Sequence, residues 1–291
     1  MLSRTVKQGL TGYLFIFPSF LLFLCFIAYP AFEAVRISFY RLTLTSNTWI
    51  GIQNFIDLYH DEEFVKALIN TLKYVAFLVP VCVVFSIVVA VLIYSKSEKT
   101  TAFYRAIFYI PAVASVVAVA LIWEWIYNPV LGIANYLLGL FGAEPLNWLA
   151  DSKLALLAIV FVMLTAAVGQ PIVLYTAALG GISQEYYEAS QIDGAGKWRQ
   201  FLSITIPLVN PTTLYVLIVA TIHAFQTFAV INLLTRGGPN GSTSSIVYLL
   251  YQTAFSYTNY GYASAMGTIL FVMIGLVSFF QFRFMTQNIE K

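Results

Sequence analysis

Residues 185–207 read EYYEASQIDGAGKWRQFLSITIP, a polar segment with two glycines in an otherwise apolar chain. Apolar runs flank it at Leu154–Tyr175 and Thr212–Leu234, and a membrane-spanning helix needs about 20 such residues. The 291-residue chain is 60% hydrophobic and 10% charged, whereas a soluble domain carries about 25% charged residues. The segment is therefore a hydrophilic connection between two predicted membrane spans.

Six apolar runs are long enough to cross a membrane. They are Leu10–Phe32, Tyr74–Tyr94, Ala106–Tyr127, Leu154–Tyr175, Thr212–Leu234 and Tyr262–Phe284. No small-x-small cleavage site ends the first run, which we interpret as a retained span and not as a signal peptide. Two shorter apolar segments, after Val130 and Ser244, favour re-entrant or interfacial helices. The sequence predicts an all-α integral membrane protein with about six transmembrane helices, forming a single domain over residues 1–291.

The distribution of basic residues predicts the orientation of the chain. An even number of spans places both termini on one side of the membrane. Lysine and arginine are more frequent in the predicted loops on that side than in those on the other. By the positive-inside rule, both termini and the segment 185–207 are expected to lie in the cytoplasm.

Several functional classes lack their characteristic residues in this sequence. Apart from Arg283, next to the end of the last span, the predicted spans contain only Glu124 and His223 as chargeable groups. Ion-driven transporters usually carry several at mid-membrane depth. No GxxxxGK[ST] phosphate loop is present, so the chain is predicted to be no enzyme and to bind no cofactor itself. The chain has only two histidines and two cysteines, which are too few and too scattered to form a convincing zinc site or a catalytic nucleophile with its base. The net charge of +2 gives no indication of a nucleic-acid partner.

Within the polar segment, local signals predict a helix, a turn and a second helix. Ser183 can cap the first helix, and Glu185 would lie favourably near its N-terminus. Gly194 can close this helix in the left-handed conformation, and a second helix begins near Lys197. The apolar side chains among these residues have two possible roles, which are docking of another protein and packing against the chain's own spans.

One motif in this segment resembles a known family. Glu188-Ala189-Ser190, Gly194 and Ile204-x-Ile206-Pro207 have the spacing of the EAA loop found in membrane subunits of bacterial ABC importers. Ser190 replaces the second alanine and Ile206 replaces the usual leucine. The longer stretch EASQIDGAGKWRQFLSITIPLVNP, with INLLTRGGPN and GYASAM further on, is similar to the maltose-type, sugar-importing branch of that family.

The resemblance implies a type I ABC importer permease fold and a set of partners in the inner (cytoplasmic) membrane of a bacterial cell. These are a second permease subunit, cytoplasmic subunits that bind ATP and Mg²⁺, and an external solute-binding protein that delivers a sugar. It also implies that residues of about 183–207 form a coupling helix against the ATPase. Its expected coupling residues are Glu188, Ala189, Ser190, Asp193 and Gly194.

Polar residues near breaks in the spans are candidates for the sugar path, because sugar hydroxyls need hydrogen-bond partners. These candidates, some supported by the resemblance, are Gln170, Thr165, His223, Gln226, Thr227 and Ser115. Each could instead form a hydrogen bond between helices, and a threonine can bond back along its own helix. Two other functions stay open: an ABC permease for a non-sugar solute, and a channel that needs no ATPase.

Overall fold

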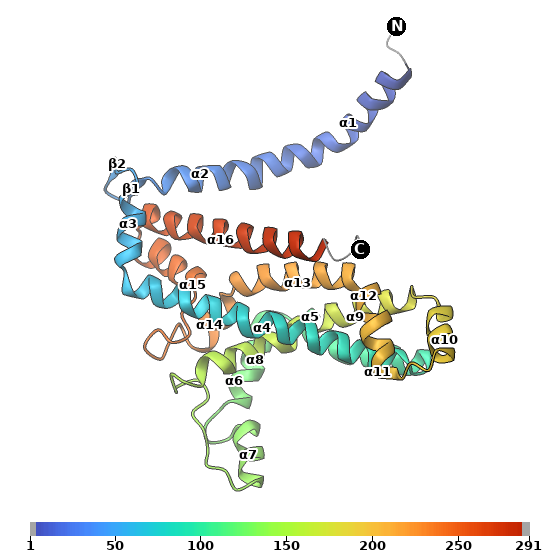
Figure 1. Cartoon of the computed structure of the whole chain (residues 1–291). Coiled ribbons are helices and arrows are strands. Elements are labelled where there is room, and N and C mark those ends of the chain that lie inside the picture. The colour runs from blue at the N-terminus through green and yellow to red at the C-terminus, as the bar shows by residue number, and fades with distance from the viewer. Residues whose placement is uncertain (1–3, 287–291) are drawn as a thin grey trace. The chain divides into compact units, whose positions relative to one another are not determined.

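The computed structural model describes residues 4–286 (Figure 1). Contacts divide the chain into two compact units, Met1–His60 with Leu250–Ile269, and Asp61–Leu249 with Leu270–Lys291. The prediction of a single domain over residues 1–291 stays a prediction. The two units are called unit 1 and unit 2 below.

Unit 1 contains the first apolar run and a small hairpin. Its elements are α1 (Arg4–Phe23), the π-helical segment η1 (Leu24–Ala28), α2 (Tyr29–Ile37), β1 (Tyr40–Leu42), β2 (Asn47–Trp49), α3 (Gln53–His60), the π-helical segment η3 (Gln252–Ser256) and the first part of α16 (Tyr260–Thr286). The strands pair antiparallel, with Tyr40 opposite Trp49. The buried Asn54 side chain of α3 donates to the carbonyls of Ser38 (2.8 Å) and Tyr40 (3.0 Å), which fixes α3 against the hairpin.

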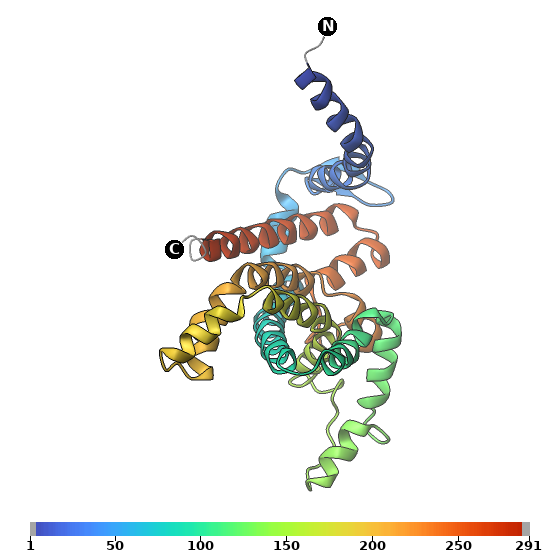
Figure 2. The same cartoon turned by 90° about the vertical axis from the view of Figure 1, so that its right-hand side faces the viewer.

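Unit 2 contains most of the helices. They are α4 (Glu62–Tyr94), α5 (Glu98–Val113), α6 (Val116–Ile126), α7 (Ile133–Leu140), α8 (Ala155–Ala167), α9 (Gly169–Gly180), α10 (Gln184–Ile192), α11 (Lys197–Gln200), η2 (Phe201–Thr205, π-helical), α12 (Ile206–Leu208), α13 (Asn210–Phe225), α14 (Ala229–Leu234), α15 (Ile246–Tyr251) and the end of α16. Helix α4 lies beside α9, α13 and α8, and α5 packs on α9 (Figure 2). The centre of unit 2 is therefore built around α4.

Helix α4 begins well before its apolar run, at Glu62 and not at Tyr74. The Asp61 carboxylate caps it by accepting from the backbone N–H of Glu63 (2.8 Å) and Phe64 (3.2 Å), which satisfies donors that a helix start leaves free. This polar extension holds the loop after α14: the Asn70 amide donates to the carbonyls of Gly241 and Ser244.

Two predicted spans are broken. Helices α5 and α6 meet at an angle of 99°, and α8 and α9 at 45°. Ser115 caps α6 after the first break. At the second break, a Cβ on Gly169 would lie 2.5 Å from the carbonyl oxygen of Phe108. Glycine therefore allows the backbones of α5 and α9 to cross in close contact.

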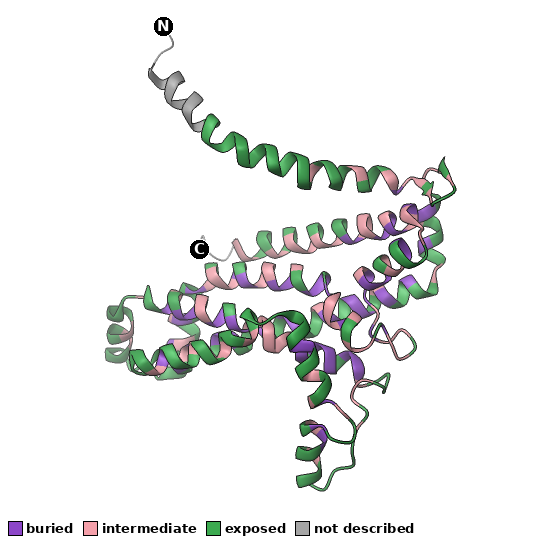
Figure 3. Ribbon diagram, turned by 180° about the vertical axis from the view of Figure 1, so that it is seen from behind, coloured by how far each residue is buried: buried purple, intermediate pink, exposed green. Residues whose placement is uncertain are grey.

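The predicted all-α membrane architecture is confirmed. Four helices in the described range 4–286 are long and apolar enough to cross a membrane, or six if each bent pair counts as one span. The short apolar segments also form helices, as α7 and as α15 with η3. Figure 3 shows purple, buried residues along α4 and α8, whereas residues 13–26 of the first run are exposed throughout.

Candidate functional site

The polar segment folds as the predicted helix, turn and helix, here called the elbow (residues 183–207). The Ser183 hydroxyl accepts from the N–H of Glu185 at 3.4 Å, which caps α10. Gly194 has φ +78°. The N–H of Ala195 donates to Ser190 O (2.9 Å), and that of Gly194 to Gln191 O (3.0 Å). These two bonds form a Schellman motif, which ends the helix at a glycine.

Side-chain hydrogen bonds connect the two arms of the elbow. The amide of the buried Gln200 donates to the Ser190 hydroxyl at 2.9 Å, and Ser190 donates to the carbonyl of Tyr187 at 2.8 Å. The hydroxyls of Tyr187 and Thr205 lie 2.9 Å apart. The elbow is thus a fixed structure, in which Ser190 has a role that the alanine of the family motif could not perform.

The apolar residues of the elbow divide between the two roles left open by the sequence. Phe201 packs on a core cluster of the helices that includes Tyr175 and Leu179. In contrast, Ile192 and Trp198 are 88% and 72% exposed. The elbow therefore has one face attached to the membrane helices and one apolar face that is open to a partner.

The expected coupling residues all lie on or next to this open part. Glu188, Ala189, Asp193 and Gly194 are exposed, and Ser190 is half-buried. Asp193 is the C-cap of α10, and its N–H donates to the carbonyl of Ala189 at 3.2 Å. A Cβ at Gly194 would meet no atom within 4 Å, so only its backbone conformation requires glycine there.

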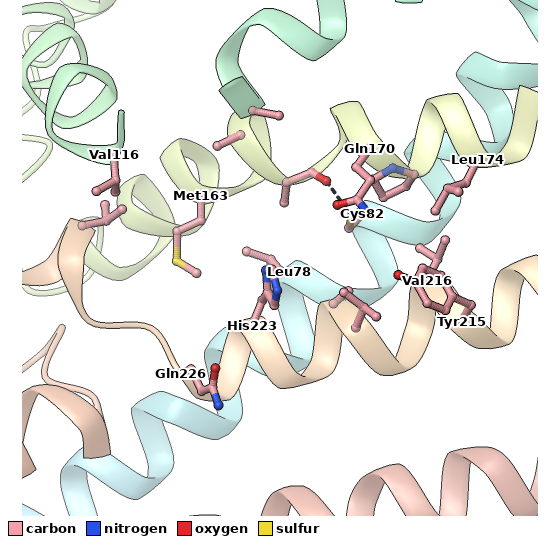
Figure 4. A pocket seen from close by; sticks show the side chains of 17 residues that line it. Leu78, Cys82, Val116, Met163, Gln170, Leu174, Tyr215, Val216, His223 and Gln226 are labelled. Atoms are coloured by element: carbon pink, nitrogen blue, oxygen red, sulfur yellow. Dashed lines mark hydrogen bonds between the residues drawn. The ribbon is translucent and has the colours of Figure 1, made fainter. Parts of the chain in front are cut away.

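A cavity of about 490 Å³ lies among α4, α8, α9 and α13 of unit 2 (Figure 4). Its wall is mostly apolar, with Leu78, Met163 and Val216 among its side chains. Three predicted path residues line it: Gln170 from α9, His223 from α13, and Gln226 at the end of α13. An apolar cavity with a few polar groups is the usual form of a small-molecule site.

The three other predicted path residues make different contacts. Thr165 donates to the carbonyl of Val162 at 2.7 Å, and the buried Thr227 donates to that of Ala224 at 2.8 Å. Both threonines thus bond back along the chain, which is the alternative to a contact with the sugar that the sequence left open. The hydroxyl of Ser115 accepts from the N–H of Val117 at 3.3 Å as the cap of α6. None of the three is part of the cavity wall, and their role in a path stays a prediction.

Sequence reasoning missed residues in both regions. In the elbow, Tyr187, Gln200 and Thr205 form the side-chain bonds between the arms. In the cavity, Tyr215 of α13 also lines the wall. No local pattern indicates Gln200, because its partners Tyr187 and Ser190 lie on the other arm of the elbow. The position of Tyr215 depends on how α13 packs, which no local pattern indicates.

The polar side chains on the cavity wall determine which groups of a solute it can bind. The described residues contain no group of three His, Cys, Asp or Glu side chains that could hold a metal ion. The polar groups on the cavity wall are amides and an imidazole, which donate to and accept from hydroxyls. The elbow follows the cavity closely in sequence, because α9 continues from Gln170 to Gly180, three residues before Ser183.

Comparison with known proteins identifies relatives over nearly the whole chain. Residues 59–291 match the family of the binding-protein-dependent transport system inner membrane component. The chain is 35% identical to the probable ABC transporter permease protein YurN of Bacillus subtilis (strain 168), covering 98% of this chain and 99% of that protein. It is also 35% identical to the multiple sugar-binding transport system permease protein MsmF of Streptococcus mutans, covering 97% and 98%.

The fold is also that of a solved structure. A chain in the crystal structure of a bacterial ABC transporter involved in the import of the acidic polysaccharide alginate superposes with a TM-score of 0.83. The identity is 23%, and 98% of each chain is covered. At this identity the likeness shows the fold alone.

These likenesses and the apolar helices define the class of protein as a multi-pass membrane permease. The chain belongs to the family of binding-protein-dependent transport system inner membrane components. The predicted resemblance of the chain to membrane subunits of bacterial ABC importers is thereby confirmed.

Proposed function

We propose that this chain is the membrane-spanning subunit of an ATP-driven importer, forming part of the path for a sugar that an external binding protein delivers. The observation that carries the proposal is the elbow, a fixed helix–turn–helix with an apolar face open to a partner. In this proposal, the open apolar face of the elbow contacts a cytoplasmic ATP-binding subunit. The chain then has no ATPase site itself, and ATP and Mg²⁺ are bound by that partner.

Within the elbow, Glu188 is proposed as the polar group that anchors α10 on the ATPase. It is exposed on the same helix as Ile192, so one contact could bury an apolar side chain beside a charged one. Ala189 and Gly194 are small and permit close approach, and Asp193 caps the helix at the turn. Ser190 holds the helix against Gln200, so that movement of α10 would be transmitted to η2 and α13.

The side chains of the cavity wall are suited to binding a solute with many hydroxyl groups. Gln170, His223 and Gln226 can donate to and accept from sugar hydroxyls, and the apolar wall suits the flat faces of a sugar ring. Among the described residues, no Asp, Glu, Lys or Arg side chain lines the cavity, which disfavours an ion as its occupant. The relative MsmF is a permease of a multiple sugar-binding transport system, and this supports a sugar for the present chain.

The proposed assembly contains a second permease subunit, two ATP-binding subunits and an external solute-binding protein. The long first helix supports such an assembly, since its described apolar residues have few contacts within this chain. In this proposal both termini and the elbow lie in the cytoplasm, which the distribution of basic residues supports. The site of action is the inner (cytoplasmic) membrane of a bacterial cell.

Uptake by a purified system tests this function. The chain would be purified from its native membranes with its bound partners, and the complex reconstituted with the binding protein in proteoliposomes with ATP inside. We expect uptake of at least one radiolabelled mono-, di- or oligosaccharide that depends on both ATP and the binding protein.

Two controls make the result decisive. Omitting the binding protein, or replacing ATP by a non-hydrolysable analogue, should abolish uptake. Uptake of polyamines or thiosulfate but of no sugar would favour the non-sugar permease. Flux that continues without ATP would instead support the channel.

A further inference from the structure

A second, smaller cavity lies next to the central one in unit 2. It has a volume of about 340 Å³ and is lined by α5 and α9, through Arg105, Ala106, Tyr109, Gln170, Val173 and Leu174. Gln170 and Leu174 line both cavities. The two cavities are thus adjacent, with the side chain of Gln170 at the boundary between them.

Arg105 is the residue of this cavity that needs an explanation. It lies inside α5 and not in the loop before it, since the helix begins at Glu98. The half-buried side chain makes no hydrogen bond or ion pair to any described residue, and its Nε is enclosed without a partner. No acidic side chain lines the cavity in the part of the chain that the structure describes. A charged group in a spanning helix is costly, so an unpaired one points to a function.

The depth of Arg105 places the small cavity on the side of the elbow. With a rise of 1.5 Å per residue, Arg105 lies roughly 10 Å from the start of α5 at Glu98. By the same rise, Gln170 lies about 15 Å from the end of α9 at Gly180, where the chain turns toward the elbow. A solute moving from the central cavity toward the elbow would therefore meet Gln170 first and Arg105 afterwards.

We propose that Arg105 and Tyr109 form an exit subsite for the transported sugar, on the elbow side of the central cavity. This inference rests on the proposed function. The guanidinium carries five N–H donors in a rigid plane and can donate two parallel bonds to neighbouring oxygens. These oxygens are vicinal hydroxyls in a neutral sugar, or a carboxylate or phosphate in an acidic one. The ring of Tyr109, one helical turn further along α5, offers a flat apolar surface to the sugar.

A phospholipid headgroup carries oxygens of the same kind, so the test must distinguish the two sources. If the small cavity belongs to the path, it contains water. If it faces lipid, position 105 is no more accessible to water than the opposite side of α5. Phe103 provides the matched control, because it is 63% exposed and lies outside the cavity, on the opposite side of the helix by the 100° rotation per residue.

Thiol labelling measures this accessibility without knowledge of the sugar. Cys25 and Cys82 would be replaced by alanine, and Arg105→Cys or Phe103→Cys introduced in the complete complex in inside-out membrane vesicles. A membrane-impermeant, positively charged methanethiosulfonate reacts with thiolates in water. We expect position 105 to react at least about tenfold faster than position 103. Equal rates would overturn the proposal and support a lipid-facing site. Tyr109→Cys against Ile110→Cys repeats the comparison if Arg105→Cys does not assemble.

Transport kinetics then test the contact with sugar. In proteoliposomes, Arg105→Gln should lower the maximal rate of sugar uptake about fivefold or more, and leave the KM for the loaded binding protein unchanged. Arg105→Lys should retain more activity than Arg105→Gln, because a charged donor remains. Lys99→Gln, which removes an exposed charge from the same helix, should transport normally. A normal rate for Arg105→Gln overturns the proposal.

The experiments distinguish failure of the Arg105 subsite from failure of the proposed sugar-import function. In that case the wild-type complex takes up no sugar, whereas the labelling rates still decide whether Arg105 faces a water-filled path. Faster labelling at position 105 without sugar uptake would overturn the sugar as the occupant of the subsite. It would leave Arg105 in the path of another solute.

Discussion

The elbow and the central cavity are two regions of unit 2 that obtain their structure in different ways. In the elbow, short-range bonds define the fold: Ser183 caps α10, and Gly194 ends it in a Schellman motif. In the cavity, the arrangement depends on contacts between distant segments, such as the crossing of α5 and α9 at Gly169. The elbow therefore tolerates changes in packing elsewhere, whereas the cavity depends on a few backbone contacts.

The difference also separates the proposed functions of the two regions. A coupling element must keep its shape while it transmits force, and the elbow has bonds between its arms for this purpose. A path must open and close, and the cavity wall comes from helices that include the bend of 45° between α8 and α9 and the end of α13 at Phe225. Four sets of variants test this comparison, in order of decreasing expected effect.

The strongest test concerns the helix crossing. Gly169→Val would place a Cβ 2.5 Å from the carbonyl oxygen of Phe108, a contact that the backbone must move to relieve. Overpacking of this kind costs about 1–3 kcal/mol or more. We expect the yield of assembled, detergent-stable complex to fall about tenfold, measured by size-exclusion chromatography. Gly139→Val is the control, because a Cβ there meets nothing within 4 Å. Equal yields for both variants would show that the crossing does not hold the cavity together.

The next test reverses the charge in the elbow. Glu188→Lys should reduce ATP-dependent sugar uptake about tenfold, since the loss of one charge-assisted contact costs about 1.5–3 kcal/mol. The helices should still insert, because the side chain is exposed and bonded to no described residue. Uptake and ATP hydrolysis in proteoliposomes measure the effect. Glu98→Lys, on the exposed first turn of α5, controls for the change in net charge. Normal uptake by Glu188→Lys would contradict the coupling role.

A smaller effect is expected on the cavity wall. Gln170→Leu removes one or two neutral hydrogen bonds to the sugar, each worth about 0.5–1.5 kcal/mol, so uptake should fall several-fold. Thr165→Val is the matched control, because that hydroxyl bonds to Val162 O and not into the cavity. Initial rates of uptake over a range of sugar-loaded binding protein measure both variants. If Thr165→Val is the more impaired, the path follows a different face of α8.

The smallest effect concerns the bond between the arms of the elbow. Ser190→Ala restores the residue usual in the family motif and removes the bond to Gln200. The loss of this bond should cost about 1 kcal/mol. A thermal-unfolding comparison with Gln200→Ala and the double variant gives the coupling energy of the pair. A coupling energy of zero would mean that the bond does not hold the two arms together.

The sequence predicted most of the elbow because its signals are local. Serine, acidic residues and glycine at fixed spacing indicate where a helix begins and ends, and the structure places the turn at Gly194 as expected. It predicted the spans from hydropathy, but it missed the polar first turns of α4. The reason is that Asn70 is polar and yet buried, where its amide bonds to a loop that is distant in sequence.

The cavity was predictable only in part. Gln170 was found because it lies beside a glycine and a proline that break a helix, which is again a local signal. For Thr165 the sequence also offered a bond back along its own helix, and the structure has this bond, to the carbonyl of Val162. The position of Arg105 inside α5 was missed for a related reason: its polar neighbours from Glu98 onward resembled a loop, although they form the start of the helix.

Photo-crosslinking from the elbow is the most direct test of the central claim, that its open face contacts a cytoplasmic ATPase. A photoreactive amino acid would replace Ile192, which is 88% exposed on α10, in cells that contain the native complex. Phe141, also 88% exposed but in the loop after α7, is the control position. We expect position 192 to crosslink to a P-loop ATP-binding protein identified by mass spectrometry, and position 141 not to do so. Crosslinks from position 192 to lipid or to other parts of this chain alone would contradict the coupling role of the elbow.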